Sequence, residues 1–119
     1  MQNEEALAAL SALGHPRRLE ALRLLVSSGA EGLLAGEVAD RLGAKQNTMS
    51  TNLAVLLRAR LVEARREGRG VRYTANIDTF SAMLQFLVSD CCGGNLAVCR
   101  ALEQALKGDQ MAEQMAKAG

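Results

Sequence analysis

The chain has 119 residues, of which 49% are apolar and 3% aromatic, and its formal net charge is +1. This length fits one compact core, and the abundance of Leu and Ala over aromatic residues favours helices. A net charge this small excludes a protein that binds nucleic acid over its whole surface, so any such site must be local. With no apolar run of about 18 residues and no signal-peptide pattern, we expect a cytoplasmic protein without a membrane partner.

Two amphipathic helices are predicted before Gly29. The first runs from Asn3 to Leu13, and the second begins at Pro16, whose missing N–H is no loss in the first turn of a helix. The second helix ends around Ser28. The side chains expected to face the core are Leu7, Leu10, Leu13, Leu19, Leu22, Leu25 and Val26.

Two more helices, joined by Gly43, are predicted after a connection over residues 30–34. They cover Ala35–Leu42 and about Lys45–Ala59. The second of them carries an apolar stripe at helical spacing, made of Met49, Leu53, Leu56 and Leu57. Two helices that meet at a glycine-containing turn are typical of a helix-turn-helix motif.

A basic hairpin is predicted next, because β-compatible segments at Leu61–Arg65 and Val71–Ala75 flank a turn with two glycines. Asp78 is expected to cap a fifth helix that runs through Val88.

The Gly93-Gly94 pair then interrupts the chain before a last helix at Leu96–Lys107. We therefore expect a mainly α protein with a small β-hairpin, a winged helix-turn-helix. Residues 1–107 are predicted to form a single domain, and residues 108–119 a flexible tail.

The outward face of the helix after Gly43 is rich in short polar side chains. They are Gln46, Asn47, Ser50 and Thr51, with Thr48 and Asn52 at the margins. These amides and hydroxyls can donate and accept hydrogen bonds at base edges, whereas an ordinary exposed face alternates Glu and Lys. Lys45 and Arg58 stand at the two ends of the helix, where each could contact the DNA backbone. The pattern predicts a recognition helix for double-stranded DNA.

Arginine is concentrated in and around the predicted hairpin, where Glu63 and Glu67 are the only acidic residues. The arginines expected to contact phosphates or the minor groove are Arg65, Arg66, Arg69 and Arg72. DNA affinity should then fall steeply with salt. No catalytic triad, paired-carboxylate site or phosphate-cradling glycine loop is present, so we do not expect an enzyme.

All three cysteines, Cys91, Cys92 and Cys99, fall within nine positions around the glycine pair. Glycines at this point permit a sharp reversal, which could bring the three thiolates to one centre. Structural zinc usually has four ligands, and the one histidine, His15, is remote in sequence. A site of three sulfurs fits trivalent arsenic or antimony, so we expect As(III), or Sb(III), to bind there.

Two other interpretations of the cysteines stay open. In the first, the thiols sense oxidants or persulfides, with Cys92 and Cys99 or Cys91 and Cys99 as the disulfide pair. In the second, they are small buried apolar side chains. A protein that buffers arsenic without touching DNA is a further alternative to a repressor.

Four stretches together resemble the ArsR/SmtB family of arsenic-responsive winged-helix repressors. They are Leu13–Glu20, Glu37–Gly43, Gln46–Leu53 and Gly68–Tyr73. The resemblance covers roughly residues 5 to 100. It implies a homodimer, with the first and late helices as helical dimerisation elements, that binds an inverted-repeat operator. It also implies that the operator is released on meeting an inducer, which the three-cysteine site would make As(III) or Sb(III).

The cysteine pattern resembles that of one subgroup of the family. Many arsenic sensors carry cysteines just before the recognition helix, but the matching stretch here, Leu33–Val38, has none. The fifth helix also lacks the spaced Asp/His/Glu set of the zinc-sensing members. The Cys-Cys-Gly-Gly run with a third cysteine downstream is similar to arsenite sensors with their site at the end of the fifth helix, although Leu96 stands where those commonly have Pro.

Overall fold

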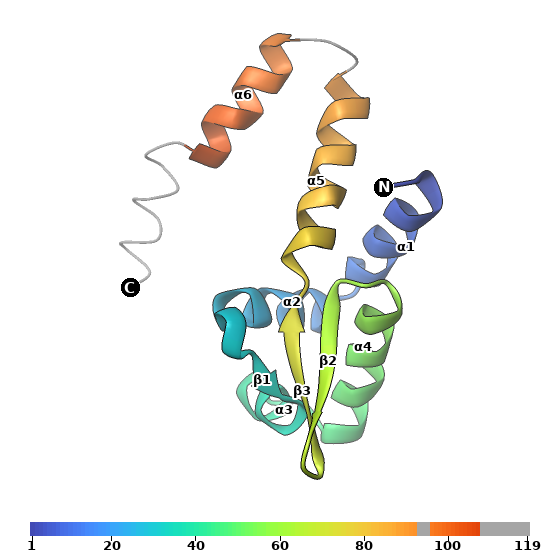
Figure 1. The fold of residues 1–119 in the computed structure, drawn as a ribbon, viewed down its shortest axis with the longest axis vertical. Coiled ribbons are helices and arrows are strands. Elements are labelled where there is room, and N and C mark those ends of the chain that lie inside the picture. The colour runs from blue at the N-terminus through green and yellow to red at the C-terminus, as the bar shows by residue number, and fades with distance from the viewer. Residues whose placement is uncertain (93–95, 108–119) are drawn as a thin grey trace. The chain divides into compact units, whose positions relative to one another are not determined.

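The structure, a computed structural model, describes residues 1–92 and 96–107, and for residues 89–92 and 96 it describes the backbone alone. Two compact units make up the chain, residues 1–83 and residues 84–119. The first unit contains, in chain order, α1 (Asn3–Leu13), α2 (Pro16–Ser27), a short 3-10 helix η1 (Gly29–Glu31), β1 (Leu33–Leu34), α3 (Ala35–Leu42), α4 (Gln46–Arg58), β2 (Val62–Glu67) and β3 (Gly70–Ala75) (Figure 1). The helix α5 (Ile77–Cys92) continues from the first unit into the second, which also contains α6 (Leu96–Lys107).

The helix-turn-helix consists of α3, a turn at Gly43 and α4 (Figure 1). Gly43 has a φ of +63°, a left-handed conformation that glycine adopts without strain. In the same turn the Ala44 N–H donates to the Ala39 carbonyl at 2.9 Å. From α2, the Arg17 guanidinium donates to the Leu42 carbonyl at 2.6 Å and so holds the end of α3. The predicted motif, and the mainly helical winged fold around it, are confirmed.

Three antiparallel strands form a sheet in the order β1-β3-β2. The hairpin of β2 and β3 matches the sequence prediction, but β1 does not, since only a connection is predicted over residues 30–34. β1 has only two residues, and Leu33, the first of them, lies opposite Tyr73. Two residues are too few to show the alternation of apolar and polar side chains by which a strand is predicted. Its approach to β3 depends on Gly32, because a β-carbon there would lie 2.1 Å from the Tyr73 carbonyl oxygen.

The buried core contains aliphatic side chains from α2, α3, α4 and the start of the hairpin: Leu22, Leu25, Val38, Met49, Leu53, Leu56, Leu61 and Val62. α1 packs on α2 and α4 through its alanines, Ala6, Ala9 and Ala12. Leu7 is 64% exposed and Leu10 is 38% exposed, so the prediction that they face the core is wrong. The alanine and leucine sets share a spacing of three and are one position apart, so periodicity alone does not choose between them.

The buried stripes of α2 and α4 are narrower than the sequence predicts. Leu19 and Val26, expected to face the core, are 44% and 39% exposed. Leu57, part of the apolar stripe predicted on α4, is 39% exposed. Each lies at the margin of its helix's buried stripe, because only part of the helix surface meets a neighbouring element.

α5 begins two residues earlier than predicted, and its capping residue is Asn76 rather than Asp78. The Asn76 side-chain oxygen accepts a hydrogen bond from the Thr79 N–H at 3.2 Å, and the Asn76 carbonyl accepts one from the Phe80 N–H at 3.1 Å. Asp78 lies in the first turn instead, where a negative charge is favourable at a helix N-terminus.

The later helices complete the described part of the chain. α5 extends past Val88 to Cys92, and α6 has the bounds that the sequence predicts. The predicted tail over residues 108–119 lies outside the described residues. Among the residues that are described, no helix has the length and apolar content needed to cross a membrane.

Candidate nucleic-acid interface

The exposed end of α4 carries a group of neutral polar side chains. Gln46, Asn47, Thr48, Ser50 and Thr51 are all exposed, and so is Lys45 at the helix start. The first turn contains no acidic residue, so no carboxylate there would repel a phosphate. The Thr51 hydroxyl donates to the Asn47 carbonyl at 3.1 Å, and its oxygen can still accept a hydrogen bond.

A groove lies between this end of α4, the start of α3 and the hairpin. It has a volume of about 620 Å³ and is lined by Gly36 of α3, Gln46, Asn47 and Ser50 of α4, and Arg69 and Val71 of the hairpin. Figure 1 shows the N-terminal end of α4 next to the lower part of the hairpin. The fold thus places polar side chains of the helix and an arginine of the hairpin on one concave surface.

Asn52 does not belong to this surface. Its exposed fraction is 7%, and it lies among the buried residues of α4 with Met49 and Leu53. The sequence places Asn52 at the margin of the outward face, and that placement is wrong. Tertiary packing decides which residues at the margin of a helix face become covered.

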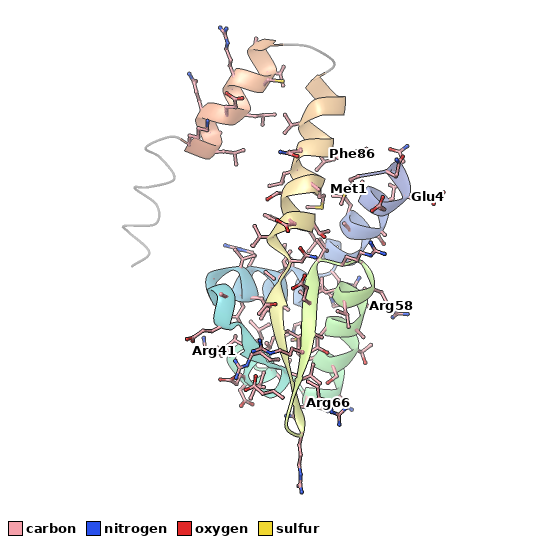
Figure 2. All side chains as sticks on the ribbon, in the orientation of Figure 1. Met1, Glu4, Arg41, Arg58, Arg66 and Phe86 are labelled. Atoms are coloured by element: carbon pink, nitrogen blue, oxygen red, sulfur yellow. The ribbon has the colours of Figure 1, made fainter. Side chains whose placement is uncertain are left out.

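Arg58 lies at the opposite end of α4 from the groove. The helix has 13 residues, which separates Arg58 from Gln46 by about 18 Å along the axis. Figure 2 shows Arg58 at the upper end of α4 and Arg66 low on the hairpin. Arg58 lines a different cleft, with Glu5 of α1 and Thr79 of α5. It is therefore not brought together with the other residues predicted to contact DNA.

The register of the hairpin assigns its arginines to two faces. Arg66 lies opposite Val71, and Arg65 lies opposite Arg72. Because directly opposite residues share one face of a sheet and neighbours alternate, Arg66 lies on the face of Val71, which lines the groove. Arg65 and Arg72 lie on the other face. Arg69 is exposed in the two-residue turn, where Gly68 has a φ of +62°.

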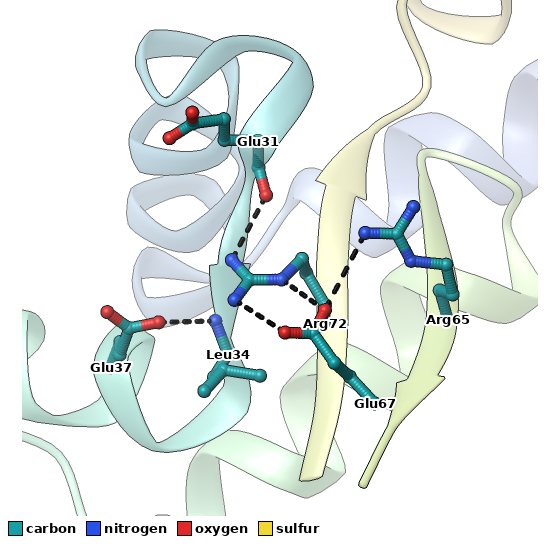
Figure 3. Close-up of polar contacts among 6 residues, drawn as sticks. All are labelled: Glu31, Leu34, Glu37, Arg65, Glu67 and Arg72. Atoms are coloured by element: carbon teal, nitrogen blue, oxygen red, sulfur yellow. Dashed lines mark hydrogen bonds and ion pairs between the residues drawn. The ribbon is translucent and has the colours of Figure 1, made fainter.

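Arg72 is held by contacts within the protein rather than left available on the surface (Figure 3). Its Nε donates to Glu67 Oε2 at 2.7 Å, its Nη2 to Glu67 Oε1 at 3.1 Å, and its Nη1 to the Glu31 carbonyl at 3.1 Å. Its side chain is 22% exposed. The sequence groups Arg72 with the phosphate-contacting arginines, and the structure instead gives all three of its nitrogens protein acceptors.

The Glu67 carboxylate was not among the residues that the sequence singled out as functional. It also lies 3.6 Å from Arg65 Nη2. The hydrogen bond from Arg72 holds the pKa of Glu67 below its usual range, and the same bond raises the pKa of Arg72. The available signal was that Glu67 is one of two acidic residues in a basic stretch, but only the register brings it to Arg72.

The predicted three-cysteine site falls largely outside the described side chains. α5 ends at Cys92, and Cys99 is the fourth residue of α6, with a half-buried side chain. The side chains of Cys91 and Cys92 are not described, so the site stays a prediction. Among the side chains that are described, no group of three or more His, Cys, Asp or Glu residues is placed to hold a metal ion.

Residues 13–65 match the family model of a helix-turn-helix domain. The chain is 30% identical over 89 residues to the HTH-type transcriptional regulator YgaV of Escherichia coli, which covers 75% of this chain and 88% of that protein. It is 29% identical over 90 residues to YbzH of Bacillus subtilis, an HTH-type transcriptional regulator, with 76% of this chain and 90% of that protein covered. These relatives are regulators of transcription and not enzymes.

Solved structures of similar proteins share the fold. Reduced HlyU from Vibrio cholerae is 31% identical, with a TM-score of 0.57 over 71% of this chain and 86% of that one. NolR from Sinorhizobium fredii is 32% identical, with a TM-score of 0.58 over 71% and 82%. The Mb0332 fragment from Mycobacterium bovis, described as a homodimeric winged helix-turn-helix DNA-binding domain of a possible ArsR-family regulator, is 30% identical, with a TM-score of 0.60 over 76% and 82%. The chain belongs to the winged helix-turn-helix transcriptional regulators of the ArsR type.

Proposed function

We propose that the protein is a homodimeric repressor that releases its operator when trivalent arsenic or antimony binds Cys91, Cys92 and Cys99. The observation that carries the proposal is the position of the cysteines: the chain's three thiols all fall within nine residues, where α5 ends and α6 begins. Soft thiolates favour such thiophilic ions.

Operator binding is assigned to the groove surface described above. In a dimer, two copies of α4 would enter successive major grooves about 34 Å apart. Base edges would be contacted by the exposed amides and hydroxyls of α4, and phosphates by Lys45 and by Arg66 and Arg69 of the hairpin.

Exposed apolar side chains support assembly through helices. Leu7 and Leu10 face outward because α1 packs through its alanines. On α6, Val98, Leu102 and Leu106 are 42%, 38% and 56% exposed and recur at every fourth position, which places them on one stripe. The homodimeric Mb0332 domain is a precedent for a dimer of this fold.

Binding of the inducer requires no oxidant. Arsenous acid would exchange its three hydroxyl groups for three sulfurs, so three As–S bonds form, three As–O bonds break and three waters leave with the thiol protons. Structural zinc sites commonly combine Cys with His, and the single histidine, His15, is remote in sequence and already caps α2, where its Nδ1 accepts the Arg17 N–H at 3.2 Å.

The helix that carries two of the cysteines is directly connected to the wing, which is the hairpin of β2 and β3. Only Asn76 separates the end of β3 from the start of α5, and α5 continues for 16 residues, about 24 Å, to Cys92. Ordering the end of this helix around an ion would change the angle between the two protomers, and the two copies of α4 would then no longer align with successive major grooves. Coupling of about 1–3 kcal/mol per site is usual for such linkage, so two sites would weaken operator binding by about two decades or more.

A thiol-redox or persulfide sensor is the second candidate. It is favoured by the 31% identical HlyU structure, which is described in its reduced form. In this mechanism a disulfide between Cys99 and Cys92 or Cys91 would replace the ion.

The test starts from an operator selected from random-sequence duplexes, and arsenite is then titrated into the complex of dimer and DNA. We expect Cys99→Ser to bind the operator like the wild type but to need at least about tenfold more arsenite for release. Ala101→Ser, which adds a hydroxyl to the same helix and keeps every thiol, is the matched control and should release like the wild type. Release of both variants at the same arsenite concentration would refute the three-thiolate site. Release by polysulfide or peroxide, but not by arsenite, would establish the second candidate.

A further inference from the structure

The end of β2 carries a carboxylate surrounded by arginines (Figure 3). Glu67 accepts two hydrogen bonds from Arg72, at 2.7 and 3.1 Å, and lies 3.6 Å from Arg65. A bidentate carboxylate contact of this kind uses the same guanidinium edge that would bind a phosphate. A protein carboxylate already in place therefore competes directly with DNA for Arg72.

The third nitrogen of Arg72 connects the hairpin to another element. Its Nη1 donates to the Glu31 carbonyl of η1 at 3.1 Å, forty-one residues away in sequence. β1 is paired to β3 at only two positions, so this bond adds a tether where the backbone pairing is short. Arg72 thus fixes the hairpin against the edge of the sheet while it is engaged with Glu67.

Arg66 and Arg69 differ from Arg72 both in exposure and, within the described residues, in the lack of a carboxylate partner. Arg66 and Arg69 are exposed, and in the described part of the chain neither has an acidic partner within ion-pair distance. Arg66 lies on the groove face of the hairpin, and Arg69 lines the groove itself.

We propose that Glu67 is an internal substitute for a DNA phosphate, which makes Arg72 a positioning residue and leaves Arg66 and Arg69 as the phosphate-binding arginines of the wing. By occupying Arg72, Glu67 lowers the number of phosphate contacts that the wing makes with any duplex. Non-specific affinity depends on that number, so Glu67 weakens binding to non-specific DNA. The inference rests on the DNA-binding part of the proposed function and not on the inducer.

The experiment measures the slope of log affinity against log salt for a mixed-sequence duplex without a selected operator, in the absence of arsenite. Each phosphate contact adds about 0.9 to this slope. We expect Glu67→Gln to steepen the slope by about 0.9 per protomer, because Arg72 is released to DNA. Glu63→Gln is the matched control, because Glu63 lies on the same face of β2, is exposed and has no ion pair among the described residues. It should leave the slope unchanged.

A charge-neutral double variant tests the role of Arg72 directly. Glu67→Gln combined with Arg72→Met removes the pair without changing the net charge, and we expect the wild-type slope. A slope shallower by about 0.9 per protomer in the double variant would overturn the proposal, since Arg72 would then already contact a phosphate in the wild type. Equal slopes for Glu67→Gln and Glu63→Gln would overturn it as well. Thermal unfolding of each variant checks that the hairpin changes do not unfold the protein.

Discussion

A β-carbon on Gly36 would lie 2.8 Å from Nε2 of Gln46, so the missing side chain at Gly36 makes room for the first amide of the recognition helix. Gly36 is in the first turn of α3, and Gln46 begins α4 on the other side of the helix-turn-helix. The shape of one helix therefore controls the position of a candidate base-contacting group on the next.

Gly36→Ala should displace the Gln46 amide without destabilising the fold. Alanine favours a helix over glycine by up to about 1 kcal/mol, and the group that must move is the end of a flexible side chain. We expect an unchanged or higher melting temperature together with an operator affinity reduced about tenfold, the size of one lost base contact. Circular dichroism and fluorescence anisotropy measure the two quantities. Unchanged operator affinity would show that Gln46 makes no base contact.

Gly32→Ala should destabilise the protein strongly. Gly32 has a φ of +61°, and an added β-carbon would lie 2.1 Å from the Tyr73 carbonyl oxygen, which is backbone and cannot move aside alone. We expect a loss of about 3 kcal/mol or more in the free energy of unfolding, as for other strained and overpacked sites. Gly29→Ala is the control, because Gly29 has a similar φ of +65° but nothing within 4 Å, and its cost should be only the backbone strain of about 1–2 kcal/mol. Equal losses in a urea titration would contradict this account.

Arg17→Ala should loosen the helix-turn-helix, because it removes the hydrogen bond at 2.6 Å to the Leu42 carbonyl at the end of α3. A charged hydrogen bond to a partly buried carbonyl contributes about 1.5–3 kcal/mol. The ion pair of Arg17 with Glu20 is exposed on both sides, so Glu20→Gln should cost less than about 1 kcal/mol. Chemical denaturation separates the two variants. If Glu20→Gln were as destabilising as Arg17→Ala, the ion pair rather than the carbonyl bond would be the important contact.

The titration of Glu67 should report its contact with Arg72. This contact lowers the pKa of Glu67 in the folded protein. The pair therefore stabilises the folded hairpin fully at pH values above the usual pKa of glutamate. That contribution is lost as the pH falls through the lowered pKa. We expect Arg72→Met to return the pKa of Glu67 towards its usual range, followed through the carboxyl carbon signal by NMR. Arg66→Met, on the opposite face of the hairpin, should leave the pKa of Glu67 unchanged; a similar rise in both variants would contradict the assigned contact.

Local signals were sufficient for most elements of the fold. Gly43 predicted the turn of the helix-turn-helix, and Pro16 predicted the start of α2, because each residue has a restricted or special backbone preference that acts within one turn. The two-residue strand β1 was missed, since its existence depends on pairing with β3, forty residues later in the chain.

The composition of the sequence by itself determined which residues could contact DNA: the polar end of α4 and the arginines of the hairpin. Only the tertiary structure decided which of them are available. It buries Asn52, separates Arg58 from the groove and pairs Arg72 with Glu67, while it leaves Gln46 beside Gly36 and Arg66 on the groove face. The physical reason is that residue type and helical period are local properties, whereas exposure and charge pairing depend on which distant segments the fold brings into contact.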